Sequence, residues 1–133
     1  MLRNIDHIGV VVKSAAQTTD ALGVAFGFRE IESFDSPQGD FSTTIVSSGG
    51  TKLELIEPTA PTGSIAKFLD KRGEGIHHVS FRVDDIEKEM KALAESGVRM
   101  TQDKPSEVGG SKVCFVHPAS TAGILVELIE QRR

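Results

Sequence analysis

The chain has 133 residues, a length at which a single domain can bury an ordinary hydrophobic core. Its hydrophobic fraction is 38%, with no apolar run long enough to span a membrane and no charged-then-apolar leader, so we expect a cytoplasmic protein without membrane contacts. A formal net charge of -4 and the lack of a basic run argue against nucleic acid as a partner.

The first half of the chain has the pattern of a strand, a helix and further strands. Residues 5–12 alternate in hydrophobicity, which is typical of a half-buried strand. Residues 14–26 have helical spacing, with Ser14 as the expected cap and Gly27 as the end. Three further strands are expected, near residues 28–34, 43–46 and 52–56.

The second half repeats this order after a linker and a short helix. The linker reads PTAPTG, and Ser64 is the expected cap of a helix that runs to about Asp70. Residues 76–83 form the next predicted strand, and residues 85–96 the next helix. The remaining strands are expected near residues 98–102, 112–117 and 124–130.

The two halves also share sequence. IDHIGVVV at residues 5–12 corresponds to IHHVSFRV at residues 76–83, and ELIE at residues 54–57 recurs unchanged at residues 127–130. The chain is therefore predicted to be one domain built by duplication. We divide it into module 1 (about 1–60), a linker with a short helix (about 61–74) and module 2 (about 75–133).

Each half carries one histidine in its first strand and one glutamate in its last. Consecutive side chains in a strand point to opposite faces, so the flanking apolar residues define the side that faces the core. His7, Glu54, His78 and Glu127 then all lie on the opposite face. A carboxylate in an apolar strand costs several kcal/mol unless it is paired or bound to a metal. These four residues are predicted to bind one divalent ion, and their nitrogen and oxygen ligands suit Zn, Co, Ni, Mn or Fe(II).

Three other residues with reactive or titratable side chains are assigned structural roles. Cys114, the sole cysteine, lies in an apolar strand and is predicted to be a packed core thiol. His77 points away from the ligand face by strand parity, so it either supports a ligand from behind or is purely structural. His117 precedes a proline and is expected to stabilise a turn.

Four segments resemble the vicinal oxygen chelate (glyoxalase/bleomycin resistance/dioxygenase) superfamily, and within it the methylmalonyl-CoA epimerases most closely. They are DHIGVVV, TKLELIEP, SIAKFLDKRGEGIHHVSFRVDDI and FVHPASTAGILVELIE, and together they cover nearly the whole chain. The resemblance implies an α+β fold in which two βαβββ modules pair edge to edge into a curved sheet around a metal site, usually in a homodimer. It places the metal ligands on His7, Glu54, His78 and Glu127, with Co, Zn, Ni or Mn as the ion.

The resemblance also implies a reaction. It is that of an isomerase of the racemase and epimerase class, which interconverts (R)- and (S)-methylmalonyl-CoA by proton transfer through a metal-stabilised enediolate. Glu127 would act as one acid/base in addition to binding the ion. Some relatives carry a second acid/base, a glutamate, where this chain has Ser42 or Thr43, so the second role passes to water, to Asp40 or to another residue.

Other functions of the same fold are distinguishable. A glyoxalase I type lactoylglutathione lyase would use the same ligands, whereas an Fe(II) ring-cleaving dioxygenase would need only two histidines and one glutamate. A small-molecule binding protein of this fold would be expected to lack the ligand set.

Lys67, Lys71 and Arg72 are either contacts for the phosphates of coenzyme A or a solvated helix face.

Overall fold

The computed structural model describes residues 2–131, and the chain divides into two compact units. The N-terminal unit is His7–His77, and the C-terminal unit is the chain from His78 onward together with the first residues up to Asp6. Along the chain, the order strand, helix and three strands occurs twice, which confirms the predicted α+β class and the repeated βαβββ module. None of the helices in the described range is long and apolar enough to cross a membrane.

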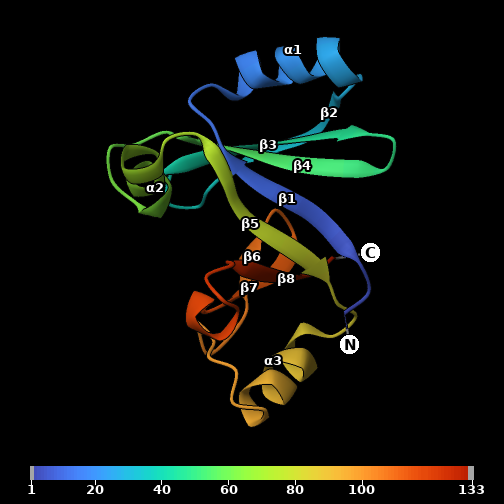
Figure 1. Ribbon diagram of the computed structural model, residues 1–133, viewed down its shortest axis with the longest axis vertical. Helices are drawn as coiled ribbons and strands as arrows, with labels where there is room; N and C mark the ends of the chain where they lie inside the picture. Colours follow the sequence, from blue (N-terminus) through green and yellow to red (C-terminus); the bar gives the residue numbers. More distant parts are fainter. Residues whose placement is uncertain (1, 132–133) are drawn as a thin grey trace. The chain divides into compact units, whose positions relative to one another are not determined.

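The N-terminal unit contains one module followed by a second helix. Its elements are β1 (Ile5–Val11, whose first two residues belong to the other unit), α1 (Ala15–Phe26), β2 (Arg29–Asp35), β3 (Phe41–Ser48), β4 (Thr51–Pro58) and α2 (Ser64–Arg72). The strand order is β2-β3-β4-β1, in which β1 and β4 are parallel and the other neighbours antiparallel (Figure 1). Helix α1 contacts β3 and β4, and α2 contacts β4.

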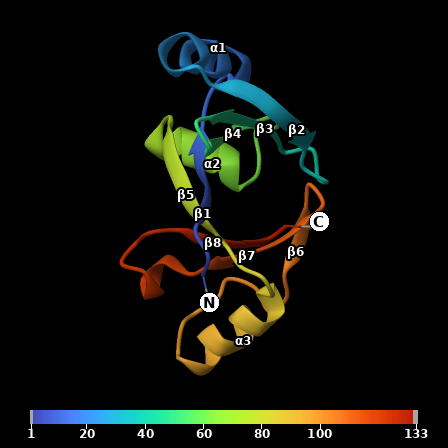
Figure 2. The same cartoon turned by 90° about the vertical axis from the view of Figure 1, so that its right-hand side faces the viewer.

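The C-terminal unit contains the second module. Its elements are β5 (Gly75–Arg82, which begins in the other unit), α3 (Ile86–Glu95), β6 (Ser106–Val108), β7 (Ser111–Val116), a 3-10 turn (Pro118–Ser120) and β8 (Val126–Glu130). The strand order is β5-β8-β7-β6, again with the first and last strands of the module, β5 and β8, parallel. Helix α3 lies against β7 and β8 (Figure 2).

Most of the predicted elements agree with the structure, but the predicted strand at residues 98–102 is wrong. This stretch makes only an isolated bridge between Met100 and Val116, and the regular strand β6 comes later, at Ser106–Val108. Pro105 stands directly before β6 and has no backbone N–H to donate to a neighbouring strand. The edge of the sheet is therefore interrupted between the two pairing segments.

The helix ends follow the predicted cap residues with one exception. The Ser14 side chain accepts a hydrogen bond from Gln17 N at the start of α1, and Gly27 ends that helix with φ 72°. Ser64, in contrast, is already helical, and the cap position of α2 is Gly63, which has no side chain to accept a bond. A Cβ at Gly63 would lie 2.7 Å from a carboxylate oxygen of Asp40, so this close approach and a φ of 102° both require glycine.

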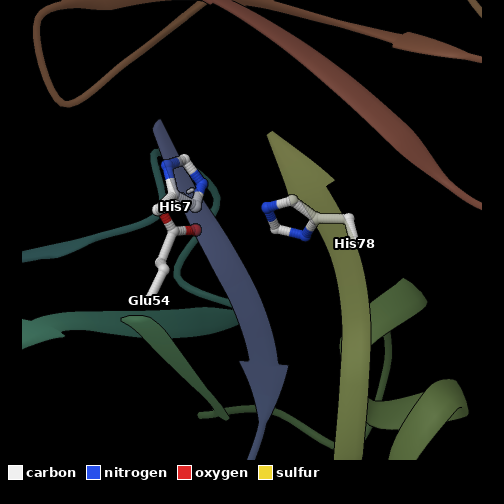
Figure 3. Close-up of side chains that lie close together, drawn as sticks. All are labelled: His7, Glu54 and His78. Atoms are coloured by element: carbon white, nitrogen blue, oxygen red, sulfur yellow. Dashed lines mark ion pairs between the residues drawn. The ribbon is translucent and has the colours of Figure 1, made fainter. Parts of the chain in front are cut away.

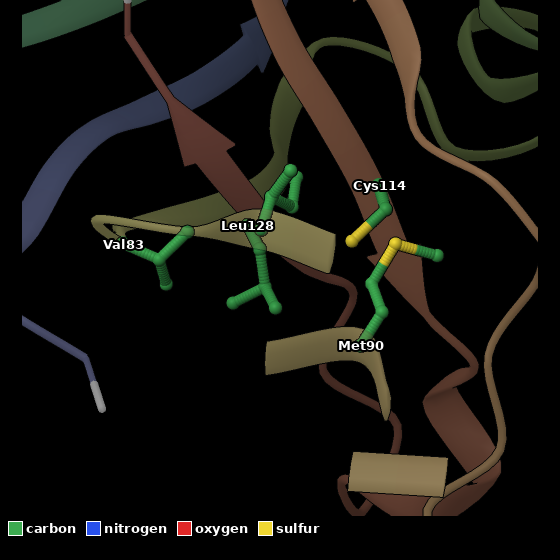
Figure 4. Packing of buried hydrophobic residues seen from close by; sticks show 5 residues of the cluster. Val83, Met90, Cys114 and Leu128 are labelled. Carbon is green, nitrogen blue, oxygen red and sulfur yellow. The ribbon is translucent and has the colours of Figure 1, made fainter. Parts of the chain in front are cut away.

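The cores confirm the predicted strand parity. In the N-terminal unit, Val12, Val46 and Leu55 pack with α1, whereas Val11 and Ile56 pack on the opposite face with α2. The core of the C-terminal unit is built around α3 and is shown in Figure 4. It consists of Val83, Ile86, Met90, Cys114 and Leu128.

The last glutamate of each ELIE segment binds the start of the helix in its own module. Glu57 Oε1 accepts a hydrogen bond from Ala15 N at 2.8 Å, and Glu130 Oε1 accepts one from Ile86 N at 2.9 Å. The first N–H groups of a helix have no partner within the helix, and the helix dipole favours a negative charge there. The repeated sequence therefore ties the last strand of each module to its helix.

We predict that Glu57→Ala and Glu130→Ala each lower the free energy of unfolding by about 1 kcal/mol, the usual cost of losing a cap. Urea denaturation measures this change. Glu32→Ala is the control, because Glu32 is exposed on β2 and its removal should change stability by less than about 0.5 kcal/mol. Equal stability of all three variants would contradict the capping role.

Cys114 is a buried core thiol, as predicted, and burial together with the negative charge of Glu127 raises its pKa from 9.0 to about 11. We predict that a thiol reagent fails to label the folded protein at pH 8 and labels it on unfolding. The unfolded chain releases this proton at lower pH than the folded chain, so the free energy of unfolding should fall as the pH rises from about 9 to about 11. Rapid labelling of the folded protein at pH 8 would contradict the assignment.

Candidate metal centre

In the N-terminal unit, parallel pairing of β1 and β4 brings His7 and Glu54 together. His7 Nε2 lies 3.2 Å from Glu54 Oε2, and the two side chains are 4% and 15% exposed. Figure 3 shows both side chains, with the ring of His7 above the carboxylate of Glu54. The sequence predicted that both residues lie on the face away from α1, and the structure confirms it because Leu55, the neighbour of Glu54, packs with α1.

In the C-terminal unit, parallel pairing of β5 and β8 brings His78 and Glu127 together in the same way. His78 Nε2 lies 3.8 Å from Glu127 Oε1, and the side chains are 2% and 8% exposed. Figure 3 also shows His78, which projects from β5. The rings of His78 and Phe115 pack edge to face with their centroids 5.6 Å apart, so an aromatic contact helps to fix the orientation of His78.

The chemistry of these side chains fits a divalent cation. Each unit offers one imidazole nitrogen and one carboxylate oxygen, and within each pair the two donor atoms face each other. Burying a carboxylate costs several kcal/mol unless a positive charge compensates it, and a cation between nitrogen and oxygen donors supplies that charge. No thiolate contributes, since the sole cysteine packs in the core, so the donors suit Zn, Co, Ni or Mn.

The register of β3 and β4 shows which of Ser42 and Thr43, at the position where some relatives carry a glutamate, lies on the same face as Glu54. Ser42 pairs with Glu57 and so lies on the side of α1, whereas Thr43 and Ile45 lie on the side of Glu54. Thr43 is 0% exposed, and its hydroxyl has no hydrogen-bond partner. Thr43 is therefore the residue that shares a face with the candidate ligand.

Asp40, the other residue considered for that role, has a structural function. Its Oδ1 accepts a hydrogen bond from Ser36 Oγ at 2.6 Å, and its other carboxylate oxygen lies beside Gly63. Ser36 Oγ in turn accepts a bond from Asp40 N. These contacts hold the turn before β3 against the start of α2.

The remaining titratable candidates also have packing partners. The ring of His77 contacts Phe68 edge to face at 5.0 Å, and the guanidinium of Arg72 lies 5.5 Å from the centre of the same Phe68 ring. His117 Nδ1 accepts a hydrogen bond from Ala119 N, which confirms its predicted role in a turn. Lys67 and Lys71 are exposed on α2.

The sequence pattern indicated no role for Ser80 or for the second glutamate of each ELIE segment. The role of the two glutamates could have been predicted, because they recur in both halves and lie on the same strand face as the core leucines. The signal for Ser80 is a difference between the halves, because Gly9 occupies the corresponding position in β1.

Comparison with known proteins places this chain in a family. Residues 6–115 match the glyoxalase/bleomycin resistance protein/dioxygenase superfamily. The chain is 31% identical to the uncharacterised protein YqjC of Bacillus subtilis, over 98% of this chain and 94% of the relative. It is 32% identical to the ethylmalonyl-CoA/methylmalonyl-CoA epimerase of Cereibacter sphaeroides, over 96% of this chain and 98% of the relative.

A solved structure agrees in fold over its full length. It is a variant of Streptomyces coelicolor methylmalonyl-CoA epimerase in complex with 2-nitronate-propionyl-CoA, with 28% identity, a TM-score of 0.92 and coverage of 100% of both chains. The sequence match, the repeated βαβββ module and the similarity of the structures agree: the chain belongs to the glyoxalase/bleomycin resistance protein/dioxygenase superfamily.

Proposed function

We propose that the chain is a metal-dependent epimerase that interconverts (R)- and (S)-methylmalonyl-CoA. The observation that carries this proposal is the buried His–Glu pair, present once in each unit of a chain whose relatives include proteins named as epimerases of this substrate. The solved relative that matches both units carries an acyl-CoA analogue, which supports a small acyl-CoA as the partner. We also propose the homodimer that the resemblance implies.

In this proposal His7, Glu54, His78 and Glu127 hold one divalent ion, which is Co, Zn, Ni or Mn. The two carboxylates neutralise its charge, and the two imidazoles bind in their neutral form. When bound, the ion would act as a Lewis acid that takes up negative charge developing on a substrate carbonyl oxygen.

The chain's own residues would supply the proton transfers. Inversion at one carbon requires removal of a proton from one face and its return to the other. Glu127, only 6% exposed, is the carboxylate that we assign to one face, since a buried base is protected from exchange with bulk water. Thr43 is not a competent base at neutral pH, and we assign the other transfer to a water held by its unpartnered hydroxyl.

We predict that metal-loaded protein incubated with (R)-methylmalonyl-CoA in deuterated water incorporates deuterium at C2 and yields the (S) epimer. Proton NMR follows the exchange, and removal of the metal with a chelator should abolish it. Ethylmalonyl-CoA is tested in parallel because a relative is named for both substrates, and methylglyoxal with glutathione tests the lyase reaction. Lyase activity without exchange at C2 would reject the epimerase.

We predict that His7→Ala and His78→Ala remove bound metal and epimerase activity together, because each takes one nitrogen ligand from the ion. Metal analysis and the exchange assay measure the two losses. His77→Ala is a matched control, since this histidine is adjacent in sequence and contacts Phe68 instead. A His78→Ala protein that keeps its metal and full activity would overturn the ligand assignment.

A further inference from the structure

Ser80 carries a buried hydroxyl without a hydrogen-bond partner. The residue is 0% exposed on β5, and its Oγ makes no hydrogen bond. Removing a hydroxyl from water without giving it a partner is unfavourable, and native proteins leave few such groups. The hydroxyl is therefore available to a group that shares its face of the sheet.

The strand register places that face beside Glu127. In the parallel pair of β5 and β8, Ser80 stands opposite Glu127, and strand parity puts it on the same side as His78. Neighbouring strands lie about 5 Å apart, so adjacent side chains on one face are within reach of each other. Ser80 is thus a hydroxyl donor next to a buried carboxylate.

The corresponding position in the other half has no side chain. Gly9 stands opposite Glu54 in the parallel pair of β1 and β4, just as Ser80 stands opposite Glu127. The distance from the carboxylate oxygen to the histidine Nε2 also differs: it is 3.2 Å between Glu54 and His7, and 3.8 Å between Glu127 and His78. The two glutamates of the duplication therefore have different surroundings.

We infer that Ser80 is a positioning residue whose hydroxyl, unpartnered in this structure, donates a hydrogen bond to the carboxylate of Glu127 when the ion is bound. Carboxylates that bind metals are commonly held by such outer hydrogen bonds. Glu54 lacks this donor and serves as a ligand alone, whereas Glu127 is oriented both to bind the ion and to transfer a proton. The part of the inference that concerns proton transfer rests on the proposed epimerase function, and the part that concerns metal binding does not.

The test compares Co²⁺ affinity in three proteins, measured by competition with a metal indicator. Ser80→Ala should weaken binding about 10-fold or more, the usual effect of losing an outer hydrogen bond. Ser80→Thr keeps the hydroxyl and should restore most of the affinity. Thr19→Val is the matched control, because Thr19 in α1 also has a buried hydroxyl without a partner and should leave the affinity unchanged.

The unfolding temperature distinguishes a positioning role of Ser80 from a role in packing. The apoprotein with Ser80→Ala should unfold at the same temperature as the wild type or a higher one, because an unpartnered hydroxyl has been removed. Wild-type Co²⁺ affinity in Ser80→Ala would overturn the inference. So would a weakened affinity that is accompanied by a lowered unfolding temperature and is not restored in Ser80→Thr.

Kinetics provide a second readout. In Ser80→Ala, kcat should fall with little change in KM, and the isotope effect of deuterium at C2 should rise for the one epimer whose proton Glu127 removes. An equal rise for both epimers would contradict a role specific to Glu127. If the wild type binds Co²⁺ but does not epimerise, the proposed reaction fails, and the Co²⁺ affinities still decide the role of Ser80.

Discussion

The rest of the structure depends on the burial of one carboxylate in the last strand of each module, Glu54 in β4 and Glu127 in β8. Glu54 and Glu127 lie in strands whose other side is packed against a helix, and each faces a histidine of the neighbouring parallel strand. A carboxylate in this setting needs a compensating positive charge. A divalent ion supplies that charge and can bind both the carboxylate oxygen and the facing nitrogen of a neutral imidazole, which offers a lone pair.

Because consecutive side chains in a strand point to opposite faces, the residues of the ELIE segment have different roles. The first glutamate faces the ligand side, the leucine packs in the core, and the last glutamate reaches the N-terminus of the helix in the same module. The same four residues thus connect the proposed metal ligand to the helix of its own module. In our proposal, duplication of the module supplies two metal ligands from each half. The two halves differ in that Gly9 in β1 corresponds to Ser80 in β5.

Much of this could be predicted from sequence because parity and repetition are local properties of strands. The alternation around His78 and Glu127 placed both on the correct face, and the predicted cap Ser14 and end Gly27 coincide with the ends of α1. The strand at 98–102 was mispredicted because the local pattern does not show that only Met100 forms a bridge there and that the regular pairing of this edge with β7 begins at Ser106. The choice of Thr43 over Ser42 needed the register with β4, which composition does not encode.

The central claim is that the two His–Glu pairs serve a single ion. Titration of the metal-free wild-type protein with Co²⁺, followed by visible absorption, tests it most directly. The account predicts saturation at one equivalent per chain and complete loss of the spectrum when either His7 or His78 is replaced by alanine. Saturation at two equivalents per chain, or a retained spectrum in one of these variants, would contradict it.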